Sequence, residues 1–179
     1  DGFQQSTPAS EIGGFNLPHV YSPWDVLGFG RVTNFIGPAV VYDDTGTFEA
    51  ISTVDILLEK GLKVTMVSRS DSVGARLPYP PVTAGAARER LYSGDFDFVG
   101  GHHLLAIEEN QVEIGVMFTN RTKKIDAKTV VFVGHNSPNR ELWVSLQGNG
   151  PEIHMIGDVR GHNSIMSAIH AGNSLGRSI

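Results

Sequence analysis

The 179-residue sequence contains no cysteine, so the chain has no disulfides, no iron–sulfur ligands and no thiol chemistry of its own. Its apolar runs all fall short of the roughly 20 residues that a membrane helix needs. The net charge is −5, and no basic cluster offers a footprint for nucleic acid. We therefore expect neither nucleic-acid nor membrane partners, and we take the cytoplasm as the default compartment.

Two kinds of catalytic signature are also missing. The seven histidines have no metal-ligand spacing, and the adjacent His102 and His103 would point to opposite faces of a strand. The chain has no Gly-x-Ser-x-Gly elbow of a hydrolase, since its match to this spacing, residues 172–176, falls inside a predicted helix and not at a strand-to-helix turn. We expect no metal site and no catalytic residue in this chain.

What is present is typical of a globular α/β protein. Hydrophobic residues make up 40% of the chain and charged residues 18%, and the 21 glycines suit tight turns between strands and helices. The first residue is Asp1 and the opening stretch does not have the shape of a signal peptide. We interpret the chain as a piece of a longer polypeptide.

A strand–helix–strand unit occupies the middle of the chain. Residues 39–43 form an apolar strand, residues 48–60 have apolar side chains at helical spacing up to Gly61, and residues 63–68 form a second strand. Because a single helix connects them, the two strands are expected to be parallel.

The remaining elements complete an α/β pattern. Ser22 and Pro23 indicate an N-capped helical turn. Further on we predict a helix over 83–92, an antiparallel meander over 102–108, 112–118 and 123–125, strands over 129–133 and 153–156, and helices over 141–146 and 164–177. The predicted fold is a Rossmann-like parallel sheet with helices on both faces, plus an antiparallel β-meander.

The turn after the first strand is where a dinucleotide pyrophosphate would bind. It reads Asp43-Asp44-Thr45-Gly46-Thr47-Phe48, so only Gly46 remains of the usual three-glycine fingerprint. Asp43 and Asp44 would repel a pyrophosphate. The turn is either a modified nucleotide pocket or a structural turn that has lost its ligand.

Two further positions can be explained either by a cofactor contact or by structure alone. Arg69 follows the second strand, where a basic side chain can accept the 2′-phosphate of NADP, although a lone Arg there is often only solvated. Gly134 follows the strand 129–133 and lets the backbone turn sharply, either beside a cofactor or simply out of the sheet.

Near the C-terminus, Gly157 and Asp158 follow the predicted strand 153–156. A carboxylate there, just before a helix, suits the flavin end or the pyrophosphate of a cofactor. The alternative is that Asp158 only caps the last helix or its approach loop.

Taken in order, these segments resemble a known family. The residues that carry the resemblance are Leu17-Pro18-His19-Val20, Trp24-Asp25-Val26-Leu27, Val40-Val41-Tyr42-Asp43-Asp44-x-Gly46, Lys63-Val64-Thr65-Met66-Val67, Thr129-Val130-Val131-Phe132-Val133-Gly134, Ile156-Gly157-Asp158 and Ala168-Ile169-His170-Ala171-Gly172. The chain is similar to the C-terminal region of multidomain NADH:flavin oxidoreductases. These are old-yellow-enzyme-like proteins of the 2,4-dienoyl-CoA reductase and trimethylamine dehydrogenase group.

The resemblance implies a larger enzyme with an N-terminal TIM barrel that carries FMN and a 4Fe–4S cluster. This chain would then comprise the tail of an FAD-type domain (1–38), an inserted NAD(P)-binding-like domain (39–127) and the return of the FAD-type domain (128–179). Its partners would be the barrel and the other half of the FAD-type domain in the same polypeptide, and a homo-oligomer is left open.

The resemblance also suggests the cofactor contacts. Asp44, Gly46, Thr47 and Phe48 match the turn over the NAD(P) pocket, Gly157 and Asp158 match a flavin or ADP contact, and Asn163, Ser164 and Ile165 match the helix start at the flavin end. In dienoyl-CoA-reductase-like members the pocket binds NADPH; in trimethylamine-dehydrogenase-like members it is vestigial, and ADP occupies the FAD-type site.

The expected function is the dinucleotide-binding, electron-transfer part of a flavin-dependent NAD(P)H oxidoreductase. Hydride would pass from NAD(P)H to FAD and onward to the cluster, FMN and an enoyl or amine substrate, so the isolated chain would be inactive. The alternative is a non-catalytic remnant that docks to the rest of its polypeptide and holds at most ADP. A stand-alone NAD(P)-binding regulator is disfavoured by the incomplete glycine fingerprint.

Overall fold

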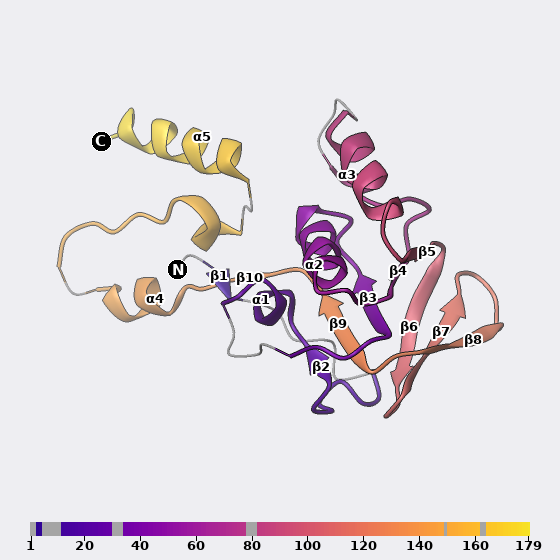
Figure 1. Cartoon of the computed structure of the whole chain (residues 1–179). Helices are drawn as coiled ribbons and strands as arrows, with labels where there is room; N and C mark the ends of the chain where they lie inside the picture. The colour runs from indigo at the N-terminus through magenta and orange to yellow at the C-terminus, as the bar shows by residue number, and fades with distance from the viewer. Residues whose placement is uncertain (1–2, 5–11, 30–33, 78–81, 149, 162–163) are drawn as a thin grey trace. The chain divides into compact units, whose positions relative to one another are not determined.

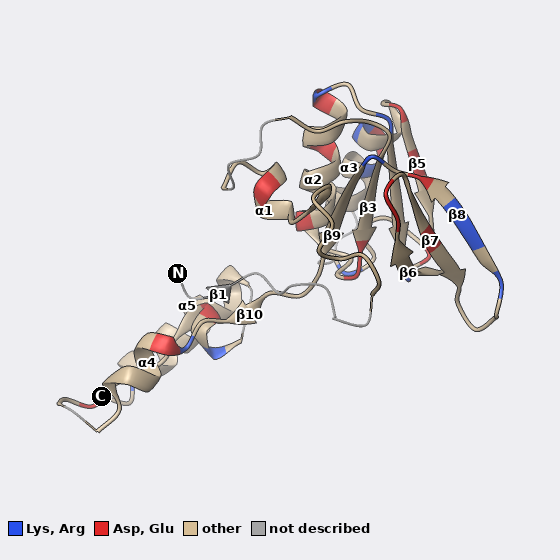
Figure 2. Ribbon diagram, turned by 90° about the horizontal axis from the view of Figure 1, so that it is seen from below, with Lys and Arg blue, Asp and Glu red and all other residues tan. Residues whose placement is uncertain are grey.

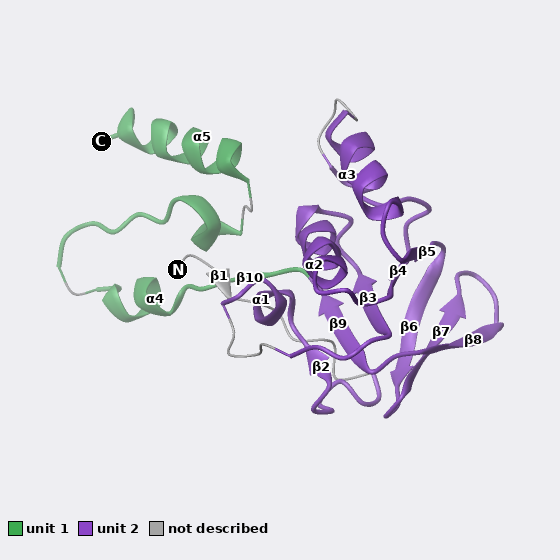
Figure 3. Ribbon diagram, in the orientation of Figure 1, with its two compact units in different colours: residues 1–6, 135–179 green, residues 7–134 purple. Residues whose placement is uncertain are grey.

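A computed structural model describes residues 3–4, 12–29, 34–77, 82–148, 150–161 and 164–179. The chain divides into two compact units (Figure 3): residues 1–6 with 135–179 form unit 1, and residues 7–134 form unit 2. The assignment of 1–38, 39–127 and 128–179 to FAD-type and NAD(P)-type domains stays a prediction. Among the described residues, no helix is both long and apolar enough to span a membrane.

Unit 2 is built on a five-stranded sheet in which every neighbouring pair is parallel (Figure 1). Across the sheet the strands are β2 (Val20–Tyr21), β9 (Thr129–Val133), β3 (Ala39–Asp43), β4 (Val64–Ser68) and β5 (Phe96–Val99). The strand–helix–strand unit is therefore confirmed. β5 is not predicted from the sequence; it is a four-residue edge strand that is held in place by its pairing with β4.

Three helices pack on one face of this sheet: α1 (Pro23–Val26), α2 (Phe48–Glu59) and α3 (Val82–Tyr92). Ile51, Val54 and Leu57 recur every three residues along α2, so one stripe of the helix is buried against the sheet. Just past this helix, Gly61 has a φ of +79°, a left-handed conformation that glycine adopts without strain.

The other face of the sheet is covered by an antiparallel meander of β6 (His102–Ile107), β7 (Gln111–Val116) and β8 (Thr122–Asp126). Val40 and Tyr42 on β3 form a second core with Leu104 and Ile114 of the meander. The expectation of helices on both faces is corrected here, since in the described part of unit 2 the meander buries the second face. Acidic and basic residues are interspersed over unit 2, with Lys123 and Lys124 on β8 (Figure 2).

Unit 1 contains a short antiparallel pair, β1 (Phe3–Gln4) with β10 (Ser137–Pro138), followed by α4 (Glu141–Leu146), the 3₁₀ helix η1 (Gly157–Arg160) and α5 (Ile165–Gly176). The predicted strand over 153–156 is wrong. A strand exists only where neighbouring strands take up its backbone hydrogen bonds, and the described part of unit 1 offers this segment none. No residue of 135–148, 150–161 or 164–179 is buried.

Candidate functional site

The first group of predicted site residues gathers at one edge of the parallel sheet. The strand register aligns Asp43 with Ser68 on one side and with Val133 on the other, so β3, β4 and β9 end at the same level. Asp44, Arg69 and Gly134 are the next residues along the chain, and the Asp44 amide donates to the Val133 carbonyl oxygen at 3.0 Å. The carboxyl edge of a parallel α/β sheet is where such folds bind ligands.

The turn between β3 and α2 is held by the Asp43 carboxylate. Asp43 is buried, and its Oδ1 accepts hydrogen bonds from the Thr45 amide at 2.9 Å, the Gly46 amide at 2.8 Å and the Thr45 hydroxyl at 2.9 Å. Burial raises the pKa of Asp43 above its ordinary value, while these hydrogen bonds act in the opposite direction. The turn thus carries its own acceptor for two amides that would otherwise be free.

Gly46 is the only glycine in this turn, and the backbone conformation at this position favours glycine. Its φ is +68°, and its carbonyl oxygen accepts a hydrogen bond from the Arg76 amide at 2.9 Å. A Cβ at this position would lie 3.2 Å from the Arg76 nitrogen. The glycine therefore permits both the left-handed turn and the close approach of the Arg76 segment.

The N-terminus of α2 differs from the preceding turn in its side-chain hydrogen bonds. Thr47 is the N-cap residue, and its side chain makes no capping hydrogen bond to the helix. Its hydroxyl lies 2.9 Å from the Thr45 hydroxyl instead. The amides of the first turn of a helix have no intrahelical partner and suit a phosphate. The turn amides that Asp43 occupies are therefore not free for a pyrophosphate. The nearest helix N-terminus is the first turn of α2, which carries the exposed Phe48 and the acidic Glu49.

Arg69 is joined to Tyr42 and Asp44 at the same edge. Its Nε lies 3.0 Å from the Tyr42 hydroxyl and 3.2 Å from Asp44 Oδ1, and the Tyr42 hydroxyl lies 3.4 Å from the same carboxylate oxygen. The hydrogen bond to Tyr42 raises the pKa of Arg69, and burial raises the pKa of Tyr42. We call these three residues the Tyr42–Asp44–Arg69 cluster.

The second group of predicted residues lies in unit 1. Gly157 and Asp158 open η1, and the Arg140 guanidinium holds the end of this helix by donating from Nε to the Val159 carbonyl oxygen at 3.0 Å. Gly157 packs close to α5, since a Cβ there would lie 3.8 Å from the Ala168 methyl group.

The start of α5 is capped by Ser164, whose hydroxyl accepts a hydrogen bond from the Ser167 amide at 3.1 Å. Asp158 is thus not the N-cap of the last helix. Ile165, the first helical residue, is exposed. Asn163 lies outside the described residues.

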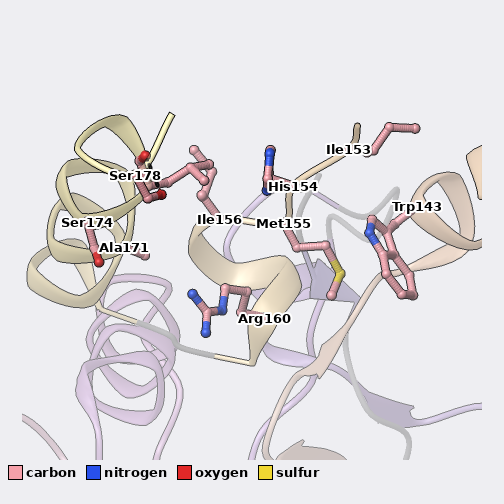
Figure 4. Close-up of a pocket in the computed structure, with 10 residues that line it drawn as sticks. Trp143, Ile153, His154, Met155, Ile156, Arg160, Ala171, Ser174 and Ser178 are labelled. Atoms are coloured by element: carbon pink, nitrogen blue, oxygen red, sulfur yellow. Dashed lines mark hydrogen bonds between the residues drawn. The ribbon is translucent and has the colours of Figure 1, made fainter. Parts of the chain in front are cut away.

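A pocket of about 430 Å³ opens in unit 1 (Figure 4). Met155 and Trp143 lie on one side of it, and Ser174 and Ser178, in and after α5, lie on the other. None of the predicted residues of unit 1 that the structure describes lines this pocket. It is bordered by the segment 153–156, which has no strand partner in the described part of the unit.

Sequence reasoning missed three residues of the unit 2 site: Tyr42, Thr45 and Arg76. The spacing of Asp43, Thr45 and Gly46 is typical of an Asp side chain that bonds the amides two and three residues on, so Thr45 had a detectable signal. The roles of Tyr42 and Arg76 depend on contacts across the fold. In the described ranges, no group of three or more His, Asp or Glu residues could hold a metal ion.

No protein-family model and no curated protein sequence matches the chain. Among solved structures, 6-hydroxypseudooxynicotine amine oxidase from Pseudomonas geniculata N1 matches with a TM-score of 0.84 at 25% identity, over 98% of this chain and 27% of that one.

Two further solved structures match nearly as well. A 2-naphthoyl-CoA reductase matches with a TM-score of 0.81 at 23% identity, over 99% of this chain and 26% of its own. Histamine dehydrogenase from Rhizobium sp. 4-9 matches with a TM-score of 0.79 at 22% identity, over 98% of this chain and 29% of that one. Disulfide reductases share the α/β fold at TM-scores of 0.52 to 0.62.

The chain spans little more than a quarter of the length of the first three matching proteins. It matches them over nearly all of its own length, and the parallel sheet with its meander is the dinucleotide-binding architecture of flavin oxidoreductases. The similarity that the order of its motifs predicts is therefore confirmed: the chain has the fold of the C-terminal region of flavoenzymes related to trimethylamine dehydrogenase.

Proposed function

We propose that the chain is the dinucleotide-binding, electron-transfer portion of a flavin-dependent NAD(P)H oxidoreductase. The observation that carries this proposal is the convergence of Asp44, Arg69 and Gly134 at the carboxyl edge of the parallel sheet. In a fold that matches an amine oxidase over 98% of the chain, this edge is the place where a nucleotide would bind.

The residues of unit 2 would bind and orient the nucleotide. Amides in the first turn of α2 would hold a phosphate, and Arg69 would lie at the ribose. A bound nicotinamide cofactor would supply hydride chemistry, and the protein would supply position and electrostatics. In unit 1, Gly157, Asp158, Ser164 and Ile165 would contact FAD or ADP.

The rest of the electron path lies outside this chain. We propose that electrons pass between FAD and an FMN site through a 4Fe–4S cluster, both held by an N-terminal barrel of the same cytoplasmic polypeptide. Two of the matching proteins are amine-directed enzymes and one is a CoA-ester reductase, which supports an amine or an enoyl compound as the substrate class.

A second candidate is favoured by one observation, the internal acceptor Asp43. Because its carboxylate already accepts hydrogen bonds from the amides of Thr45 and Gly46, the turn is stable without a ligand. Unit 2 would then be a structural remnant that docks to the rest of its polypeptide, and the chain would hold at most ADP in its FAD-type part.

Calorimetric titration with NADPH, NADH, FAD and ADP separates the two candidates. Micromolar binding of a nicotinamide dinucleotide is expected from a working site. Arg69→Gln is expected to weaken NADPH binding at least about tenfold, a loss of about 1.4 kcal/mol. Arg90→Gln is the matched control, because the Arg90 side chain is as exposed as that of Arg69 and also pairs with an aspartate. Binding of ADP alone, unchanged by Arg69→Gln, would favour the remnant.

A further inference from the structure

The Arg69 guanidinium is already engaged by groups of this chain. Its Nε faces Asp44 Oδ1 at 3.2 Å and the Tyr42 hydroxyl at 3.0 Å. The Asp44 side chain is the less exposed partner, with 28% of its surface accessible against 57% for Arg69. The carboxylate is therefore partly withdrawn from water and shields the positive charge from one side.

Arg69 follows the second strand, at the position that reads the nucleotide ribose, and its ion pair brings the Asp44 carboxylate to the same place. Asp44 is the first residue after β3 and Arg69 the first after β4, and these strands are paired from Ala39 with Val64 to Asp43 with Ser68. In dinucleotide-binding folds an acidic group at this edge accepts a hydrogen bond from the ribose 2′-hydroxyl, whereas an Arg accommodates a 2′-phosphate. Here one site contains both, and they neutralise each other.

The consequence differs for the two nucleotides. A 2′-phosphate would have to approach the Asp44 carboxylate and compete with it for the guanidinium, so like-charge repulsion offsets the attraction of Arg69. A 2′-hydroxyl can donate a hydrogen bond to the same carboxylate without breaking the ion pair.

We propose that Asp44 is a specificity-determining residue, which through its ion pair with Arg69 makes the site select adenine nucleotides with a free ribose 2′-hydroxyl over those with a 2′-phosphate. This inference rests on the proposed function and deepens it. It reverses the preference for NADP that Arg69 alone would suggest.

The test measures the affinities of the 179-residue chain for NADH and NADPH, with the intrinsic fluorescence of the reduced nicotinamide as the probe. Wild type binds NADH more tightly. Asp44→Asn keeps the size of the side chain and removes its charge, so the NADPH-to-NADH affinity ratio rises by about tenfold, the scale of one charge at a half-exposed site.

Two variants complete the design. Asp55→Asn is the matched control, because Asp55 pairs with Arg90 on the helices of the same unit, and the substitution changes the net charge equally. Its affinity ratio stays at the wild-type value. Arg69→Gln lowers NADPH affinity further and leaves Asp44 able to accept the 2′-hydroxyl; circular dichroism confirms that each variant is folded.

The outcomes are distinct for the inference and for the proposed function. A wild-type preference for NADPH, or an unchanged ratio in Asp44→Asn, overturns the role of Asp44 while the nucleotide site stands. Binding of NADPH by Asp44→Asn alone, with no binding of NADH by the wild type, overturns the inference, because the wild-type site then selects neither nucleotide. Absence of binding in every variant overturns both.

Discussion

At the scale of single residues, the unit 2 site depends on two neighbouring aspartates that have different roles. Asp43 is buried and its carboxylate accepts hydrogen bonds from the turn, whereas Asp44 is partly exposed and pairs with Arg69 across two strands. Their adjacency in the sequence indicates only a local concentration of negative charge. Alternation of side-chain direction along the end of a strand separates their roles.

Asp43 gives the stability of the chain a pH dependence. Because burial raises its pKa in the folded state, the folded chain holds this proton more tightly than the unfolded chain does. The stabilising contribution is fully present below the unfolded pKa of about 4 and is lost as pH rises through the folded pKa.

Asp43→Asn removes this titration and keeps an acceptor oxygen for the turn. Urea unfolding of wild type and variant across pH 3 to 8 checks the effect, and we expect the wild type to lose stability relative to the variant as pH rises. Parallel curves over the whole range would show that Asp43 does not titrate differently on folding.

Gly46→Ala tests the strain in the turn. The substitution places a Cβ at a φ of +68° and 3.2 Å from the Arg76 nitrogen, so we expect a loss of about 1–3 kcal/mol in the free energy of unfolding. Gly61→Ala is the control, because Gly61 has a φ of +79° with open space around the missing Cβ. Equal losses would mean that the Arg76 contact adds nothing to the backbone strain.

At the scale of elements, α2 illustrates what periodicity can and cannot resolve. The sequence marks Ile51, Val54, Ile56, Leu57 and Leu58 as apolar at helical spacing. In the structure Ile51, Val54 and Leu57 are buried, whereas Ile56 and Leu58 are only partly covered. The sheet can contact only one stripe of the helix. The orientation of the helix on the sheet therefore places Leu57, and not Leu58, in the core.

Leu57→Ala and Leu58→Ala therefore differ although the residues are neighbours. Leu57 is completely buried, and its truncation should cost about 2–5 kcal/mol in the free energy of unfolding, through lost transfer energy and a cavity. Leu58→Ala should cost clearly less. Chemical denaturation measures both, and a larger loss for Leu58→Ala would contradict the assignment of the buried stripe.

At the scale of the whole molecule, the two units differ in what they bury. The buried hydrophobic residues of the described chain all fall between Val26 and Val133, within unit 2. In unit 1, Ile165, Met166 and Ile169 of α5 expose 82%, 79% and 67% of their surface. An apolar face of this kind, in a chain that spans about a quarter of the length of its structural matches, supports the proposal that further polypeptide covers it.

Hydrogen exchange measured by mass spectrometry checks this difference. In the isolated chain we expect the amides of α5 to exchange much faster than those of α2, because α5 packs against no buried core. Joining the chain to the rest of its polypeptide should slow exchange in α5 and leave α2 unchanged. Equal protection of both helices in the isolated chain would contradict the prediction.

Elements that depend on local interactions are predictable from the sequence. The periodicity of 48–60, the apolar runs 39–43 and 129–133 and the polar turns of the meander each predict a structure that the fold contains, because side-chain alternation and turn chemistry act over a few residues. The order of these segments also sufficed to predict the structural relatives.

Other features depend on contacts between segments that are distant in the sequence. The segment 153–156 has the composition of a strand, but strand formation depends on neighbours that are distant in sequence and that the described part of unit 1 does not supply. The pairing of Asp44 with Arg69 likewise depends on the register of β3 with β4, which brings together two charges 25 positions apart in the chain. A linear pattern encodes which residues are charged, and the fold decides which charges meet.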